Sequence, residues 1–191
     1  LAPLVCQRGK PNVKRVMVFI DGNNFEAALT ALYGSQQRVD YLKLAEYVAA
    51  RRDGMLQRIY YYTAVGNLDK AKAAATKSFI DHLNKKIPKC IAKLGYLSVV
   101  GTDASGNPIF TEKGTDVNIA VDLVSLAFHN GYDEAILFSA DTDYEAAIKM
   151  ARSLGKNVVA GVVDQQKAGY MKDLCDEYIT LKKEDFNQCM R

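Results

Sequence analysis

The sequence is poor in the residues that usually bind zinc or carry redox chemistry. Its 191 residues include two histidines and four cysteines, and no two cysteines form a CxxC pair. Zinc ribbons and thioredoxin-like sites need such pairs, and disulfide frameworks are typical of short secreted chains. The cysteines therefore indicate reduced thiols in a cytoplasmic protein.

Long apolar runs and a strong net charge are also missing. No apolar run has the length that a membrane-spanning helix needs, so we expect no membrane partner. Residues 1–14 lack a secretory pattern and are expected to form a loose leader. The net charge of +3 is too small to indicate a nucleic-acid partner by itself. The length suits one domain, which we expect over 15–185, with a tail at 186–191.

What the sequence does contain is a regular alternation of short apolar runs and helical patterns. Runs with strand character are expected at 15–20, 57–65, 96–100, 134–139, 157–163 and, more weakly, 177–181. Helical patterns lie at 24–33, 40–52, 68–94 (interrupted near Pro88), 115–130, 143–154 and 166–174. This alternation predicts an α/β fold, a three-layer αβα sandwich around a mainly parallel sheet of five to six strands.

One stretch breaks this alternation. The segment 101–114, "GTDASGNPIFTEKG", is polar and rich in turn residues. Loops of this length in compact domains are usually functional or disordered. We therefore expect a long loop here.

Acidic residues follow the predicted strands at one end. In "VMVFIDGNNF" the apolar run stops at Asp21, and "EAILFSADTDYE" places Asp141 and Asp143 after another strand. A third segment, "EKGTDVNIAVDL", places Asp116 at the start of a helix. Ligands of open α/β sheets bind beyond the carboxyl ends of the strands. If the first and fourth predicted strands are neighbours, the four carboxylates meet in one pocket.

Each acid taken alone also has a structural interpretation. Asp21 before Gly22 suits a helix cap or an Asx turn. Asp116 and Asp143 suit first-turn acids that complement a helix dipole. The joint site is favoured because three separate segments place acids at the same end of the predicted sheet.

Two threonines are expected to cap helices. Thr142 with Glu145 three residues later matches a capping box, and Thr115 can cap the helix that it begins. With Thr142 in that role, Asp141 is left without a capping function.

Several carboxylates in a small volume remain ionised together only when cations compensate them. Oxygen ligands without histidine or thiolate favour Mg²⁺ or Mn²⁺ over zinc. A pair of such ions can activate water for in-line displacement at phosphorus. Asp21 is then a metal ligand at a strand end, and the Asn24 amide can orient substrate or a metal-bound water.

Asp122 has a different setting. At helical spacing it forms a polar stripe with Asn118, Ser125 and His129 on an otherwise apolar helix. Periodicity alone favours a solvated face for this stripe.

The segment 68–94 carries an excess of positive charge, with seven lysines and two aspartates. Its lysines include Lys85, Lys86 and Lys89, and such a segment can attract phosphates by counterion release. A single lysine is more often simply solvated. A tyrosine at the end of the run 60–62 could supply a stacking surface for an unpaired base.

These motifs resemble the NYN domain, a PIN-like nuclease family that includes LabA-like proteins. The resemblance runs through "FIDGNNF", "KGTDVNIAVDL" and "ILFSADTDYEAAIKMARSLGKNV", in that order, and covers about 16–163. It implies an acidic centre for Mg²⁺ or Mn²⁺ made of Asp21, Asp116, Asp141 and Asp143. The sequence has Ala140 and Tyr144 where the family commonly has glycine and phenylalanine.

The resemblance also implies roles for three further residues. Asn24 and Lys113 match residues near the substrate, and Asp122 matches a recurrent acid that is a possible further metal ligand. The function implied is a metal-dependent endoribonuclease that acts on single-stranded RNA. A catalytically weak or inactive RNA-binding module remains open as the alternative, as does a homo-oligomer.

Another aspartate-centred family fits less well. Phosphatases of the haloacid dehalogenase type also place an aspartate after their first strand, but they need a second acid two residues later. Asn23 occupies that position here.

Overall fold

The computed structural model describes residues 13–65, 70–103, 106 and 108–190. At 96–99 and 108–113 it describes the backbone without the side chains. The expected leader therefore lies almost entirely outside the described residues.

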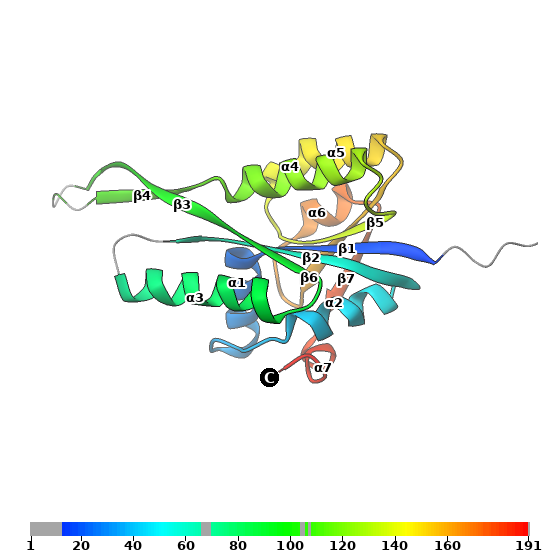
Figure 1. The fold of residues 1–191 in the computed structure, drawn as a ribbon, viewed down its shortest axis with the longest axis horizontal. Coiled ribbons are helices and arrows are strands. Elements are labelled where there is room, and N and C mark those ends of the chain that lie inside the picture. The colour runs from blue at the N-terminus through cyan, green and yellow to red at the C-terminus, as the bar shows by residue number, and fades with distance from the viewer. Residues whose placement is uncertain (1–12, 66–69, 104–105, 107, 191) are drawn as a thin grey trace, which may run out of the picture.

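The described strands form one seven-stranded sheet in the order β4-β3-β2-β1-β5-β6-β7 (Figure 1). All neighbouring strands are parallel except β3 and β4, which pair antiparallel. The strands are β1 (Lys14–Asp21), β2 (Gly54–Val65), β3 (Cys90–Thr102), β4 (Pro108–Lys113), β5 (Glu134–Phe138), β6 (Asn157–Val163) and β7 (Glu177–Leu181).

Helices cover both faces of the sheet, as expected for parallel strands joined by crossovers. One face carries α4 (Thr115–Phe128), α5 (Glu145–Ser153) and α6 (Gly169–Leu174) (Figure 1). The other face carries α1 (Gly22–Tyr33), α2 (Tyr41–Ala50), α3 (Lys70–Lys86) and α7 (Lys183–Phe186). A short 3₁₀ helix, η1 (Thr142–Tyr144), precedes α5. The predicted α/β sandwich is confirmed.

The central strand β1 divides the core into two apolar clusters. Val18 and Ile20 pack on the face of α1 and α2, whereas Met17 and Phe19 pack on the face of α4 and α5. Every one of these side chains is buried because the strand has a helical layer on each side. This explains why the run is continuously apolar rather than alternating.

The helix expected over 68–94 is shorter in the structure. It ends at Lys86, and the chain enters β3 at Cys90. Pro88 has no N–H to donate and disfavours helical backbone at the residue before it, and Lys89 adopts a left-handed φ of 60°. The lysines of the segment 68–94 are therefore divided between α3, the turn that follows it and β3.

The long loop expected over 101–114 is partly a strand. Pro108–Lys113 forms β4, which pairs with β3 and makes a hairpin that extends past the body of the sheet (Figure 1). This antiparallel strand is the one that the sequence did not predict. It leads directly into α4, and so it fixes where α4 begins.

The C-terminal residues pack against the body. Phe186 and Cys189 are fully buried, and the Asp40 N–H donates to the Cys189 carbonyl at 2.7 Å. Cys90, Cys175 and Cys189 are buried free thiols. None is placed to form a disulfide or a metal site with another described residue.

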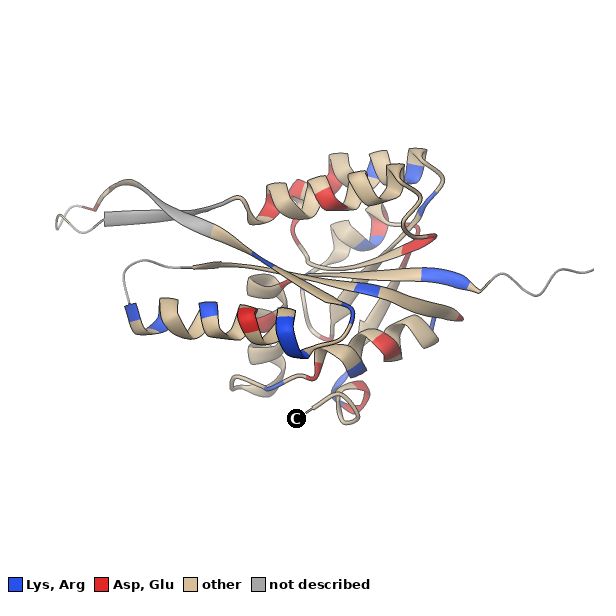
Figure 2. Cartoon of the chain, viewed as in Figure 1, with Lys and Arg blue, Asp and Glu red and all other residues tan. Residues whose placement is uncertain are grey.

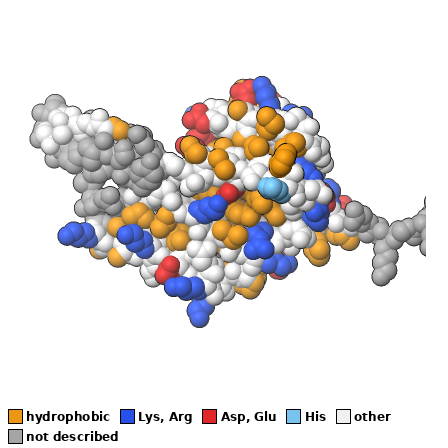
Figure 3. All heavy atoms as spheres, turned by 45° about the horizontal axis from the view of Figure 1, so that its top comes forward, with side chains coloured by type: hydrophobic (Ala, Val, Ile, Leu, Met, Phe, Trp, Pro, Cys, Tyr) orange, Lys and Arg blue, Asp and Glu red, His pale blue; other side chains and the backbone are white. Residues whose placement is uncertain are grey.

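The surface has three distinct regions. Acidic residues occur along α4, and α3 carries mainly basic residues (Figure 2). The outer face of α4 and α5 is apolar and includes the exposed side chains of Val121, Phe128 and Met150 (Figure 3). Among the described helices, none combines the length and apolarity that crossing a bilayer would require.

Candidate acidic site at the carboxyl ends of the strands

The strand order reverses between β1 and β5, which are hydrogen-bonded neighbours. β2 and β3 lie on one side of this point, and β6 and β7 lie on the other. Asp21 is the last residue of β1, and Asp141 follows β5 closely. The pairing that the sequence argument required is present, and it creates the crevice in which open α/β sheets bind their ligands.

Three carboxylates meet at this crevice. Asp116, Asp141 and Asp143 each present an oxygen, and these three atoms lie within 4.8 Å of one another. Asp141 is half-buried, while Asp116 and Asp143 are exposed. Asp116 comes from the first turn of α4, whereas Asp141 and Asp143 flank the start of η1. The three carboxylates are therefore supplied by two elements, the first turn of α4 and the turn that begins η1.

Asp21 lies beneath these three residues. Its side chain is buried and caps α1, because Oδ1 accepts a hydrogen bond from the Asn24 N–H at 3.2 Å. Its Oδ2 accepts from the Ser139 hydroxyl at 3.0 Å. Burial raises the pKa of Asp21, and the nearby Asp116 raises it further. The capping interpretation is confirmed for this residue, in addition to its place beside the acids.

Tyr144 connects the buried and exposed carboxyls. Its hydroxyl oxygen lies 2.8 Å from Asp116 Oδ1 and 3.2 Å from Asp21 Oδ2, and its ring is fully buried. A hydroxyl has one hydrogen to donate, so it cannot fully satisfy two ionised carboxylates at once. The shorter contact assigns that hydrogen to Asp116.

The capping expected of the two threonines is wrong. Asp141 itself caps η1, with its Oδ1 accepting from the Asp143 N–H at 3.0 Å. Gly114, with a φ of 92°, occupies the N-cap position of α4, and Thr115 is the first helical residue. The Thr115 hydroxyl is buried and has no hydrogen-bond partner among the described residues. Capping by Asp141 uses one of its oxygens, and no described residue bonds the other.

Asn24 ties the crevice together through its side-chain oxygen. Oδ1 accepts from the Ala140 N–H at 3.1 Å and from the Gln166 side-chain amide at 2.6 Å. These bonds hold the turn that carries Asp141 against the start of α1. In this structure Asn24 therefore positions the acidic turn.

Gly22 explains why the first motif contains a glycine. A Cβ at this position would lie 2.4 Å from the Tyr61 hydroxyl oxygen and 2.7 Å from the Tyr62 carbonyl oxygen. Contacts this short with backbone cannot be relieved by a side-chain rotation. Glycine lets α1 start directly beside β2, and this places Asp21 and Asn24 in the crevice.

Asp122 lies outside the group of three. Its carboxylate accepts from the Tyr62 hydroxyl at 2.7 Å and pairs with Lys93 at 2.7 Å. The solvated face expected from periodicity is therefore wrong for this residue, because a lysine from β3 reaches over to neutralise it. The arrangement provides a structural role for the recurrent acid.

The lysines named from the sequence lie elsewhere. Because α3 runs back from the end of β2 to the start of β3, its last residues lie toward the amino ends of the strands. Lys85 and Lys86 end α3, and Lys89 lies in the turn that follows; Lys85 pairs with Asp81 at 2.9 Å. The structure does not bring them to the acids. Lys113 ends β4 three residues before Asp116, and its side chain lies outside the described residues.

Three contributors to the crevice were not predicted as such: Ser139, Tyr144 and Gln166. Ser139 and Tyr144 stand within the quoted motif "SADTDYE", so the sequence offered a signal for both. Gln166 lies 142 positions from its partner Asn24, and no local pattern indicates that contact.

Comparison with protein families matches the NYN domain over residues 15–182. The chain belongs to the NYN domain family. The match runs from the second residue of β1 to the residue that follows β7. Membership of this family, which lies within the PIN-like nucleases, supports a nuclease-type function.

Two individual proteins are similar to this NYN domain. The low amplitude and bright protein LabA of Synechococcus elongatus is 27% identical over 176 residues, which cover 87% of this chain and 83% of LabA. A solved protein of unknown function from Vibrio parahaemolyticus shares the fold with a TM-score of 0.64. It is 18% identical, and the match covers 93% of this chain and 98% of that one.

The residues of this NYN domain suit a divalent cation of the hard, oxygen-binding kind. The convergent atoms are carboxylate oxygens, and no histidine or cysteine belongs to any candidate metal group among the described residues. Mg²⁺ and Mn²⁺ prefer such ligands, whereas zinc in proteins usually takes nitrogen or sulfur. The unused oxygen of Asp141 and the exposure of its two neighbours leave room for coordination.

Proposed function

We propose that this protein is a ribonuclease that hydrolyses phosphodiester bonds of single-stranded RNA with the help of Mg²⁺ or Mn²⁺. The observation that carries the proposal is the convergence of Asp116, Asp141 and Asp143 at the switch point of the sheet. Family membership supports the nuclease class, and the oxygen-only group of side chains supports the metal.

The mutual repulsion of these three carboxylates is the reason to propose a bound cation. Two unit charges 4.8 Å apart repel each other by about 1 kcal/mol in water and by roughly 3–4 kcal/mol at an effective dielectric constant of 20. Three such pairs exist within the group, and an incoming RNA phosphate would add a fourth negative charge. A site of this kind repels its substrate unless positive charge is supplied.

The proposed ligands are Asp116, Asp141 and Asp143. When bound, Mg²⁺ or Mn²⁺ would activate a water molecule and neutralise charge on the phosphate oxygens. The protein contributes alignment: capping of η1 fixes Asp141, and the Tyr144 hydroxyl fixes Asp116.

Asp21 takes a supporting role in this proposal. Both of its oxygens already accept hydrogen bonds, Oδ1 from the Asn24 N–H and Oδ2 from the Ser139 hydroxyl, so binding a metal directly would require one of these bonds to break. We therefore assign it first to holding the crevice together, and second to adding negative charge behind the ligands.

The test is cleavage of an end-labelled single-stranded RNA in Mg²⁺, in Mn²⁺ and in EDTA. The wild-type protein and an Asp173→Asn control, which alters an exposed aspartate on α6, should cleave only with metal. Asp141→Asn should bind the RNA and fail to cleave it. RNA binding without cleavage by the wild-type protein would instead support the alternative, an inactive RNA-binding module.

A further inference from the structure

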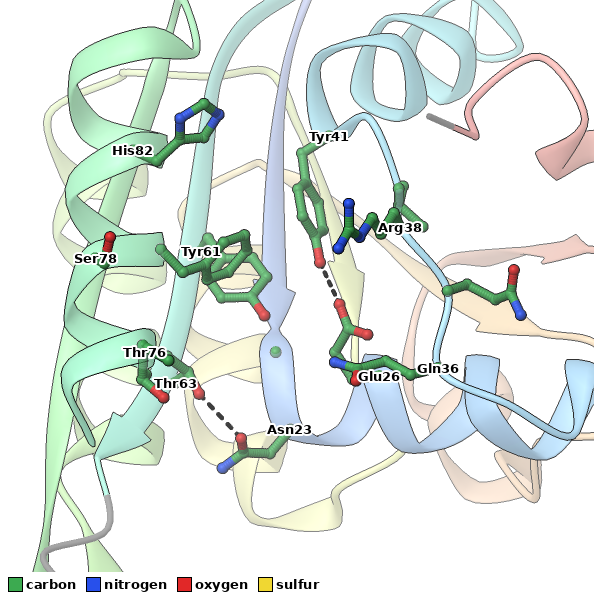
Figure 4. A pocket seen from close by; sticks show the side chains of 15 residues that line it. Asn23, Glu26, Gln36, Arg38, Tyr41, Tyr61, Thr63, Thr76, Ser78 and His82 are labelled. Atoms are coloured by element: carbon green, nitrogen blue, oxygen red, sulfur yellow. Dashed lines mark hydrogen bonds between the residues drawn. The ribbon is translucent and has the colours of Figure 1, made fainter. Parts of the chain in front are cut away.

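A large groove lies beside α1, on the face of the sheet that α1 and α3 cover. It has a volume of about 920 Å³ and is bounded by α1, the segment 34–40, β2 and α3 (Figure 4). Asn23 lies at one end of it and His82 at the other, with Tyr61 between them (Figure 4). The sequence motifs and the proposed metal chemistry leave this groove without a role.

Aromatic rings form much of the inner wall. The Tyr61 ring packs edge-to-face with Tyr41 at 5.0 Å and with Phe79 at 5.5 Å between centroids. Tyr61 and Tyr41 are buried, whereas Phe79 is partly exposed. Phe79 is therefore the ring of the three that a flat, aromatic ligand can contact, and the buried Tyr61 ring beneath it holds it in place.

The polar groups of the groove favour a ligand with N–H donors. Glu26 is largely enclosed, and burial raises the pKa of its carboxyl group. Its Oε1 accepts a hydrogen bond from the Tyr41 hydroxyl, and no described residue bonds Oε2. The exposed amide side chain of Gln36 supplies a further donor and acceptor at the rim. This combination matches the edge of a nucleobase, which carries both kinds of group.

The same carboxyl group disfavours a phosphate inside the groove. Positive charge is instead available at the margin, where the Arg38 side chain is exposed. A nucleotide would therefore be oriented with its base inward and its phosphate outward.

Position relates the groove to the acids. Gly22 and Asn23 line the groove, and the residues on either side of them, Asp21 and Asn24, belong to the acidic crevice. The first turn of α1 therefore borders both the groove and the acidic crevice, so an RNA strand that crosses this turn can reach both.

We propose that this groove binds an unpaired base of the RNA strand, close to the phosphate that the acids address. The inference rests on the proposed RNA substrate. It adds a base-binding subsite on the α1–α3 face, built from Tyr61, Phe79 and Glu26, which would let the enzyme require unpaired nucleotides.

The experiment compares two fluorescein-labelled oligonucleotides by anisotropy in EDTA, where metal-dependent cleavage is prevented. One is an eight-nucleotide oligoadenylate, and the other is its fully abasic analogue with the same sugar–phosphate chain. Ala75→Trp fills the groove, and Ala74→Trp places the same side chain next to it on α3, outside the groove. Both alanines are exposed, so both variants should fold.

The wild-type protein and Ala74→Trp should bind the oligoadenylate on the order of 10-fold more tightly than the abasic analogue, the scale of base–aromatic stacking. Ala75→Trp should bind the two equally. Equal binding of the two oligonucleotides by the wild-type protein, or equal effects of the two tryptophans, would overturn the proposal. Base-dependent binding without any cleavage in Mg²⁺ or Mn²⁺ would keep the groove and reject the nuclease.

Discussion

Tyr144→Phe removes one oxygen atom from the centre of the acidic crevice. The phenylalanine ring can occupy the same buried space, so the change isolates the hydroxyl group. That hydroxyl lies 2.8 Å from Asp116 and 3.2 Å from Asp21. A hydrogen bond to a charged group stabilises a protein by about 1.5–3 kcal/mol.

Two features of the site reduce this figure. Asp116 is exposed, so water can replace the hydroxyl there, and Asp21 keeps its bonds to Asn24 and Ser139. We therefore expect a loss of about 1–2 kcal/mol in the free energy of unfolding without metal. For a chain of this length each kcal/mol lowers Tm by about 2–4 °C.

The larger effect should be on metal binding, because the hydroxyl holds a proposed ligand in place. Loss of such a supporting bond typically weakens metal affinity by roughly 10- to 100-fold. Urea unfolding in EDTA measures the first effect, and Mn²⁺ titration measures the second. The control is Tyr178→Phe, an exposed tyrosine on β7. Tyr144→Phe with the stability and Mn²⁺ affinity of that control would refute the role of the hydroxyl.

Three further predictions concern other parts of the molecule. Lys113→Ala should leave folding and metal binding intact and slow single-turnover RNA cleavage at saturating Mn²⁺, by less than the order of 10²-fold that a preorganised donor provides; an unchanged rate would make it a solvated lysine. Changing Lys70 and Lys77 to alanine should flatten the salt dependence of RNA binding, by about 0.7 in the logarithmic slope per lost phosphate contact. The same change at Lys85, Lys86 and Lys89 should flatten the salt dependence less, because these lysines lie toward the amino ends of the strands. A larger effect of this change than of the change at Lys70 and Lys77 would show that Lys85, Lys86 and Lys89 contact the RNA. Finally, hydrogen bonds from Arg15 hold the pKa of Asp133 below its usual value, so this pair stabilises the fold above the unfolded pKa of about 3.9 and loses that contribution as the pH falls through the folded pKa. The stability difference between wild type and Asp133→Asn, measured by urea unfolding, should therefore shrink below about pH 4; a difference that grows there would contradict the assignment.

The sheet and the place of the acids could be predicted because they depend on local patterns. A fully apolar run such as the one before Asp21 indicates a strand buried on both faces, and parallel strands share a carboxyl edge. The positions of Asp21, Asp141 and Asp143 follow from that geometry, and Asp116 joins them from the start of a helix. The strand order itself needed the structure, since the pairing of β1 with β5 is a long-range contact.

What could not be predicted depends on contacts between distant residues. The sequence predicts the segment 90–94 as the end of a lysine-rich helix, because its four apolar residues and one lysine suit a helix as well as a strand; its pairing with β2 shows that it is a strand. The role of Tyr144 depends on the simultaneous approach of Asp21 and Asp116, and periodicity contains no information on this. Likewise, the salt bridge of Asp122 requires Lys93 from another element.

The most direct test of the account is a titration of the metal-free protein with Mn²⁺, in which electron paramagnetic resonance measures the free ion. The wild-type protein and Asp173→Asn should bind Mn²⁺ with equal affinity. Asp141→Asn should lose more affinity than Tyr144→Phe, because it removes a proposed ligand rather than a supporting bond. Equal Mn²⁺ binding by wild type and Asp141→Asn would contradict the claim that these carboxylates form the metal site.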